Sequence, residues 1–86
     1  MKLPRFFSNT EKIKALSKLP IVELAGTKRV LVENHLGVLA YSASEIQIKL
    51  SYGKLSVAGN DLEFMQLNRE QLVITGNVDT LQLYRR

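Results

Sequence analysis

The chain lacks cysteine and tryptophan, and its 86 residues include two prolines and one histidine. Without cysteine it has no disulfide framework and no thiolate ligand for zinc. No apolar run approaches the roughly 18 residues that a membrane span needs. The apolar residues near the N-terminus are interrupted by charges, which is unlike a signal peptide. These absences predict a cytoplasmic protein, associated with membranes only peripherally.

Patterns typical of catalysis are also missing. The single histidine, His35, lies in a predicted turn, where it is best explained as a turn or packing residue. Most acidic residues fall at outward strand positions or in turns, as on a solvated face. The glycines form no phosphate-binding loop, and residues 42–44 lack the nucleophile elbow of hydrolases. We therefore expect no enzymatic activity, no cofactor, no metal and no small-molecule substrate.

The net charge of +4 is unevenly distributed along the chain. Residues 1–29 carry a net charge of +5, residues 30–84 carry −3, and Arg85 and Arg86 add +2. A nucleic-acid-binding domain presents a basic stripe on a folded surface, so the mildly acidic central part disfavours nucleic acid as a partner. A basic N-terminal arm instead favours contact with an anionic membrane surface or an acidic protein.

Residues 1–20 are predicted to form this basic arm, with a short amphipathic helix in its second half. A polar side chain among residues 8–10 can cap the helix, and Pro20 ends it. The helix has a narrow apolar stripe made by Ile13, Leu16 and Leu19. A helix of about ten residues is marginal in isolation, so it needs a surface on which to dock.

The arm has two interpretations. In the first, aromatic rings enter the headgroup boundary of a membrane while cations meet anionic lipid or an acidic partner. The contact residues are then Lys2, Arg5, Phe6, Phe7, Lys12, Lys14 and Lys18. In the second, the apolar stripe docks on the folded domain and the lysines face water.

Residues 21–84 are predicted to form a single β-domain, because the apolar period changes from that of a helix toward two. Short strands are expected over residues 21–25, 29–33, 38–41 and 45–50. In the last of these, apolar residues alternate with polar ones, which is the pattern of a half-buried strand.

The stretch from Leu55 to Leu83 contains an echo, in which Leu55, Val57, Gly59 and Asn60 recur as Leu72, Ile74, Gly76 and Asn77. Hairpin turns at residues 51–54, 60–61, 68–71 and 76–79 would pair apolar residues on one face. A change of phase at Phe64 and Met65 indicates a bulge or burial on both faces. We predict a small antiparallel meander or β-sandwich of about six to seven short strands. The alternative is a short β-solenoid.

Four segments of the chain resemble the YabP/YqfC family of sporulation proteins. Residues 30–41, VLVENHLGVLAY, contain the family's Glu-Asn-x-x-Gly pattern. Residues 55–62 and 67–76 are similar to its second half, in which an apolar-x-apolar-x-Gly turn precedes a polar tetrad and a repeat of the first pattern. Residues 19–26, LPIVELAG, match the YqfC branch better than the YabP branch. The resemblance covers residues 18–84, with Asn68 standing where the family often has threonine.

The resemblance implies a non-enzymatic protein of endospore-forming bacteria, made in the mother cell during sporulation. YqfC-type proteins are encoded beside YqfD, an integral membrane protein, so a YqfD-like membrane protein is the implied partner. We therefore expect an interaction or assembly module in the cytoplasm, peripheral at the forespore membrane. Exposed strand edges favour a homo-oligomer as well. The alternative function is a nucleic-acid-binding module that uses the basic termini.

Overall fold

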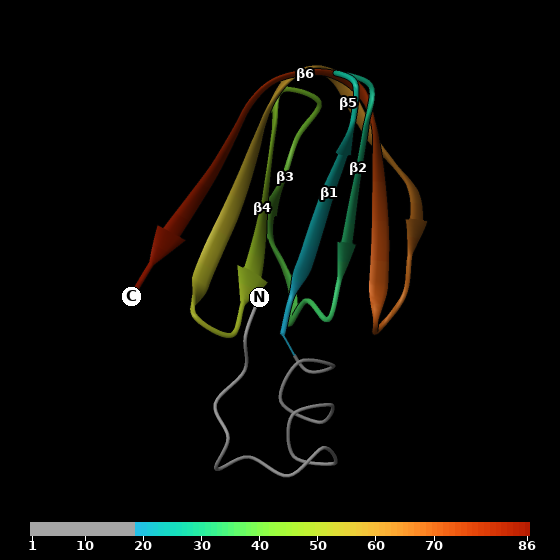
Figure 1. Cartoon of the computed structure of the whole chain (residues 1–86). Coiled ribbons are helices and arrows are strands. Elements are labelled where there is room, and N and C mark those ends of the chain that lie inside the picture. Colours follow the sequence, from blue (N-terminus) through green and yellow to red (C-terminus); the bar gives the residue numbers. More distant parts are fainter. Residues whose placement is uncertain (1–18) are drawn as a thin grey trace, which may run out of the picture.

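A computed structural model describes residues 19–86, which form one open antiparallel sheet of six strands (Figure 1). The strands are β1 (Ile21–Ala25), β2 (Arg29–Glu33), β3 (Gly37–Tyr41), β4 (Glu45–Leu50), β5 (Gly53–Leu67) and β6 (Gln71–Arg85). Their spatial order is β1-β2-β6-β5-β4-β3. The predicted mainly antiparallel β fold is confirmed, whereas the solenoid alternative is wrong. The predicted N-terminal helix lies largely outside the described residues.

The strand order differs from that of a meander, because β6 lies between β2 and β5. Two strands are also much longer than expected, since β5 and β6 have 15 residues each. The predicted hairpin turns at residues 60–61 and 76–79 are therefore wrong. Both Gly-Asn pairs instead lie inside continuous strands, where Gly59 pairs with Val78 and Asn60 pairs with Asn77.

The Gly-Asn pairs mark the place where β5 and β6 bend together. Figure 1 shows the two long strands crossing over one end of the molecule, so that the halves of the sheet face each other. Asp61 takes a positive φ of 55°, and the register shifts between Asn60 and Glu63. Such an irregularity bends a strand while leaving its neighbours paired.

The other turns are partly as predicted. Leu67 pairs with Leu72 across the β5–β6 turn, and the predicted bulge is confirmed by the register shift between Phe64 and Gln66. The β4–β5 turn is shorter than predicted, so that Ile48 rather than Leu50 pairs with Leu55. A shift of two residues keeps every side chain on its predicted face, because the side-chain period of a strand is two.

The bend divides the sheet into two layers. Layer 1 contains β1, β2, residues 71–75 of β6 and residues 62–67 of β5; layer 2 contains β3, β4, residues 53–58 of β5 and residues 78–85 of β6. Each layer thus consists of a hairpin, the first half of one long strand and the second half of the other. The two layers are related by an approximate two-fold axis through the bend.

Matching hydrogen bonds support this two-fold relation. The Gly59 and Leu62 N–H groups donate to the carbonyls of Ser44 and Ala43, in the β3–β4 turn, at 3.0 and 2.8 Å. The Gly76 and Val78 N–H groups donate to the carbonyls of Lys28 and Thr27, in the β1–β2 turn, at 3.2 and 2.7 Å. The echo in the sequence therefore corresponds to two equivalent bends, each capped by the turn of a hairpin.

The core lies between the layers and draws on both. Its fully buried side chains are Val30, Val32, Leu62, Leu72 and Ile74 from layer 1, and Ile46, Ile48, Leu50, Leu55 and Val57 from layer 2. Burial of each aliphatic side chain contributes about 1.5–3 kcal/mol. Because both layers supply one shared core, neither can bury its inner face without the other.

Candidate functional site

The seven arm residues predicted to contact a membrane or partner lie outside the described part of the chain. They are Lys2, Arg5, Phe6, Phe7, Lys12, Lys14 and Lys18. Their role stays a prediction. Within residues 19–86, no helix has the length and apolarity of a membrane span.

His35 is nearly buried, and both of its ring nitrogens have partners. Its Nδ1 accepts the Gly37 N–H at 3.0 Å, so Nε2 carries the proton that is donated to the Asn68 carbonyl at 2.7 Å. The ring therefore ties the β2–β3 loop to the β5–β6 turn. This is the packing role predicted for it, and no group of three metal-ligating side chains occurs among the described residues.

A basic groove lies on the outer face of layer 2, at the end away from the bend. It has a volume of about 350 Å³ and is lined by Leu39, Lys49, Gly53, Lys54, Tyr84, Arg85 and Arg86. Successive strands supply these residues, because Lys49 pairs with Lys54 and Lys54 pairs with Tyr84. No acidic side chain lines the groove, although residues 19–86 contain as many acidic as basic residues.

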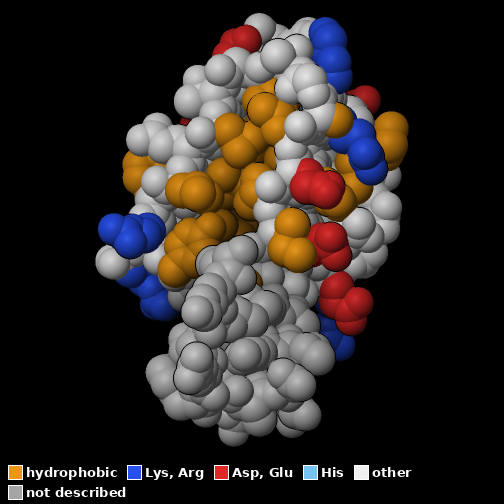
Figure 2. All heavy atoms as spheres, viewed as in Figure 1, with side chains coloured by type: hydrophobic (Ala, Val, Ile, Leu, Met, Phe, Trp, Pro, Cys, Tyr) orange, Lys and Arg blue, Asp and Glu red, His pale blue; other side chains and the backbone are white. Residues whose placement is uncertain are grey.

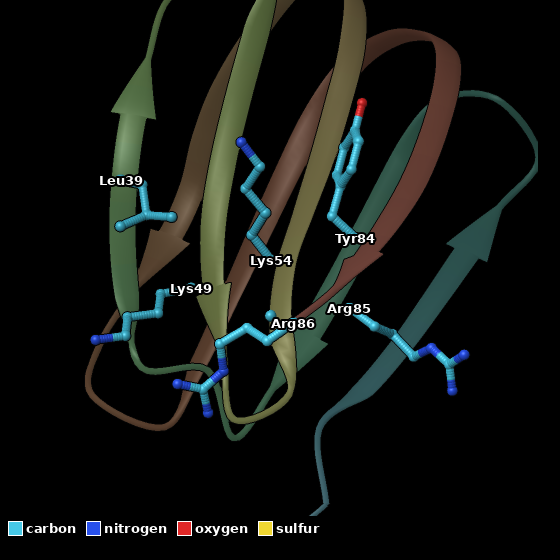
Figure 3. A pocket seen from close by; sticks show the side chains of 7 residues that line it. Leu39, Lys49, Lys54, Tyr84, Arg85 and Arg86 are labelled. Carbon is cyan, nitrogen blue, oxygen red and sulfur yellow. The ribbon is translucent and has the colours of Figure 1, made fainter.

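The side chains of the groove differ in how firmly they are placed. Figure 3 shows Lys54 and Tyr84 pointing in the same direction, with Lys54 Nζ 5.1 Å from the centre of the Tyr84 ring. Arg86 donates from Nη2 to the Ser51 carbonyl at 2.7 Å, which holds the last residue against the β4–β5 turn. Arg85 points away from the others (Figure 3). The groove thus presents Lys49, Lys54 and Arg86 around apolar surface.

A polar row continues from the groove along layer 2. Lys54 Nζ donates to Gln47 Oε1 at 3.3 Å, and Gln47 Nε2 donates to Glu45 Oε2 at 3.2 Å. Ser56 Oγ donates to the same carboxylate oxygen at 2.8 Å. The hydrogen bonds from Ser56 and Gln47 lower the pKa of Glu45 below its ordinary value, and the bond from Ser56 has the larger effect. Coulombic attraction to Lys54 also lowers this pKa. The Glu45 carboxylate is therefore already engaged by neighbouring side chains.

A second candidate surface is apolar and lies where the edges of the layers meet. We call the side between β1 and residues 78–85 of β6 the open side. Leu24 and Leu83 lie on the inward faces of these strands, yet they are 50% and 53% exposed. Figure 2 shows hydrophobic side chains gathered in a strip between the layers, with charged side chains at its margins.

Sequence reasoning did not find the basic groove. In the sequence, Arg85 and Arg86 stand out only as terminal charges. The alternation along β4 and β5 places Lys49 and Lys54 on the outward face, which is the one available signal. Their neighbours across the sheet depend on the register, and the register depends on the length of the turns.

Comparison with known proteins gives a consistent result. The model of the YabP family matches residues 18–86. The uncharacterized protein YqfC of Bacillus subtilis (strain 168) is 25% identical over 64 residues, which cover 74% of this chain and 69% of YqfC. No solved structure matches the chain.

Proposed function

The chain belongs to the YabP family, which is associated with sporulation, and from this premise we propose that it is a non-enzymatic interaction module. Its partner is a membrane protein of the YqfD type, met at the forespore membrane from the cytoplasm of the mother cell. The match of residues 18–86 to the family model, together with the 25% identity to YqfC, supports the sporulation context.

The basic groove carries the proposal. Lys49, Lys54 and Arg86 surround apolar surface from Leu39 and Tyr84, without an acidic residue in the lining. Charge-assisted hydrogen bonds to carboxylates are among the stronger polar contacts, and a tyrosine at the centre of an interface adds rigid apolar area. An acidic segment of a protein partner has the chemistry that fits this surface.

Co-purification from sporulating cells tests the groove. We expect the full-length variant Lys49→Glu/Lys54→Glu to recover at least about tenfold less membrane protein than the unchanged chain, because the partner's carboxylates meet repulsion. Arg69→Glu reverses an exposed charge in the β5–β6 turn, outside the groove, and should recover normal amounts. Equal recovery with both variants, at equal thermal stability, would contradict the proposal.

The arm supplies a second contact in this proposal, with anionic lipid. Its cations and the Phe6–Phe7 pair suit the headgroup boundary. Co-sedimentation with anionic liposomes should fall when residues 1–19 are removed. Binding that is equal with and without the arm, or absent from both, would remove the membrane contact while leaving the groove untouched.

The nucleic-acid alternative gains one observation, since Lys54 and Arg86 flank an exposed tyrosine on which a base could stack. It predicts an affinity that falls steeply with salt. An absence of any gel shift with single- or double-stranded DNA or RNA at low salt would eliminate it.

A further inference from the structure

The two-fold relation makes the two sides of the molecule comparable. The side between β3 and residues 62–67 of β5, which we call the stacked side, is bridged twice. The Tyr41 and Phe64 rings stack across it, with centroids 5.1 Å apart and planes at 28°. At the end of this side away from the bend, His35 Nε2 donates to the Asn68 carbonyl at 2.7 Å. Two contacts thus join layer 2 to layer 1 along this side.

The open side has smaller side chains at the equivalent positions. The row Leu24, Val30, Ile74 and Phe64 in layer 1 corresponds to the row Tyr41, Ile46, Val57 and Leu81 in layer 2. Leu24 and Leu81 therefore stand where Tyr41 and Phe64 stand on the stacked side. Two leucines are smaller than a tyrosine and a phenylalanine, so the equivalent gap is less filled.

The residue two positions before each edge strand shows the same contrast. Glu33 corresponds to Lys49, so Ile21 corresponds to Gly37 and Leu19 corresponds to His35. His35 is 8% exposed, whereas Leu19 is 50% exposed. Leu19 therefore stands at the position that His35 fills on the stacked side, but Leu19 remains half exposed.

The N-terminal arm joins the described chain at Leu19, next to the open side, and can therefore cover the exposed apolar residues there. Asn34 Nδ2 donates to the Leu19 carbonyl at 2.9 Å, which anchors the end of the arm beside β1. Ile13 and Leu16 continue the apolar stripe from Leu19 at helical spacing. A helix over residues 10–19 would be about 15 Å long. The five residues of β1 extend over about 17 Å, so the lengths match.

We propose that the open side is the docking site of the protein's own N-terminal segment. Ile13 and Leu16 pack against Leu24, Leu81 and Leu83. Lys14 and Lys18 lie on the opposite side of the predicted helix from the stripe, so a docked arm still presents these cations to solvent. The docking is independent of the basic groove, which lies on the outer face of layer 2.

Engineered thiols test the docking directly, because the natural chain has no cysteine. In the full chain, Leu16→Cys/Leu83→Cys should form an intramolecular disulfide in a glutathione buffer. The effective concentration of this pair should exceed that of two controls by at least about tenfold. Lys14→Cys/Leu83→Cys has nearly the same tether on the polar face, and Leu16→Cys/Leu67→Cys uses the equivalent position on the stacked side.

Each other outcome of this experiment overturns the proposal. Equal effective concentrations for the Leu16→Cys and Lys14→Cys pairs would mean that the arm is tethered near the open side without docking on it. A preference for Leu67 would place the arm on the stacked side. Disulfides that form between molecules would assign the open side to a second copy of the chain.

Amide hydrogen exchange gives an independent measurement on the full chain. Ile13→Asp/Leu16→Asp should accelerate exchange in β1 and at residues 81–84 by at least about tenfold, while residues 62–67 keep their rates. Lys14→Asp/Lys18→Asp changes charge on the opposite face of the predicted helix and should leave exchange on both sides unchanged. If Ile13→Asp/Leu16→Asp left the exchange rates of β1 and residues 81–84 unchanged, the docking would be contradicted.

Discussion

Gly59 lies where β5 crosses from one layer to the other, and the backbone of β6 passes directly against it. A Cβ atom at this position would lie 1.9 Å from the Asn77 carbonyl oxygen. Because the obstacle is paired backbone and not a flexible side chain, relief requires that the two long strands separate. Glycine is needed here for close approach.

We expect Gly59→Ala to lower the free energy of unfolding by about 1–3 kcal/mol, the usual cost of overpacking. Urea denaturation measures the effect. Gly26→Asn is the matched control, since Gly26 has a positive φ that asparagine tolerates and open space around it. A Gly59→Ala protein as stable as the control would contradict the close approach at the bend.

Glu45 gives the fold a specific dependence on pH. Its folded-state pKa is lowered mainly by the hydrogen bonds from Ser56 and Gln47; desolvation opposes this shift, and attraction to Lys54 adds to it. A lowered folded-state pKa contributes stability above the ordinary value of 4.5, and the contribution is lost as the pH falls through the folded-state pKa.

The urea midpoint of Glu45→Gln should therefore fall less steeply than that of the unchanged chain between about pH 6 and about pH 3. Ser56→Ala removes the largest cause of the shift and should reproduce part of this change. Parallel pH profiles for all three proteins would refute the role assigned to these hydrogen bonds.

At the scale of elements, the stacked rings of Tyr41 and Phe64 hold the edge strand β3 against the second half of β5. The strands belong to different layers and share no backbone pairing, so the contact depends on side chains alone. Aromatic pairs contribute about 0.5–1.5 kcal/mol beyond their buried area. A double-mutant cycle with Tyr41→Leu and Phe64→Leu should give a coupling energy of this size.

A second cycle provides the comparison. Tyr41 faces inward in layer 2, whereas Tyr84 pairs with Lys54 on the outer face, so Tyr41→Leu and Tyr84→Leu should be additive within about 0.3–0.5 kcal/mol. If both cycles gave the same coupling energy, the coupling between Tyr41 and Phe64 could not be attributed to the stacking of their rings.

At the scale of the whole molecule, the two layers should unfold together because they share one core. Leu55 and Leu72 hold equivalent positions in the two layers and are both fully buried. Leu55→Ala and Leu72→Ala should each lower stability by about 2–5 kcal/mol. Far-ultraviolet circular dichroism and tyrosine fluorescence should report one coincident transition in each variant.

Two separated transitions in either variant would mean that one layer persists without the other. That result would contradict a core shared across the bend. The polar substitution Gln82→Ala, on the exposed outer face of layer 2, serves as the control and should change stability by less than about 0.5 kcal/mol.

Much of the strand pattern followed from residue order, because alternation with a period of two is a local property. The bounds of β1, β2 and β4 agree with the prediction, and the phase change at Phe64 and Met65 correctly indicated a bulge. The sequence alone also shows that the arm is basic whereas the following residues are mildly acidic. It likewise shows the apolar stripe that ends at Leu19.

Only the tertiary structure decided what the Gly-Asn pairs do. A glycine followed by asparagine suits a hairpin turn and a bent continuous strand equally well, and the choice depends on partners far away in sequence. The carbonyls of Ser44 and Lys28 receive the N–H groups of Gly59 and Gly76, so the strands bend without ending. The basic groove and the open side follow from that choice, because the register then sets which side chains become neighbours.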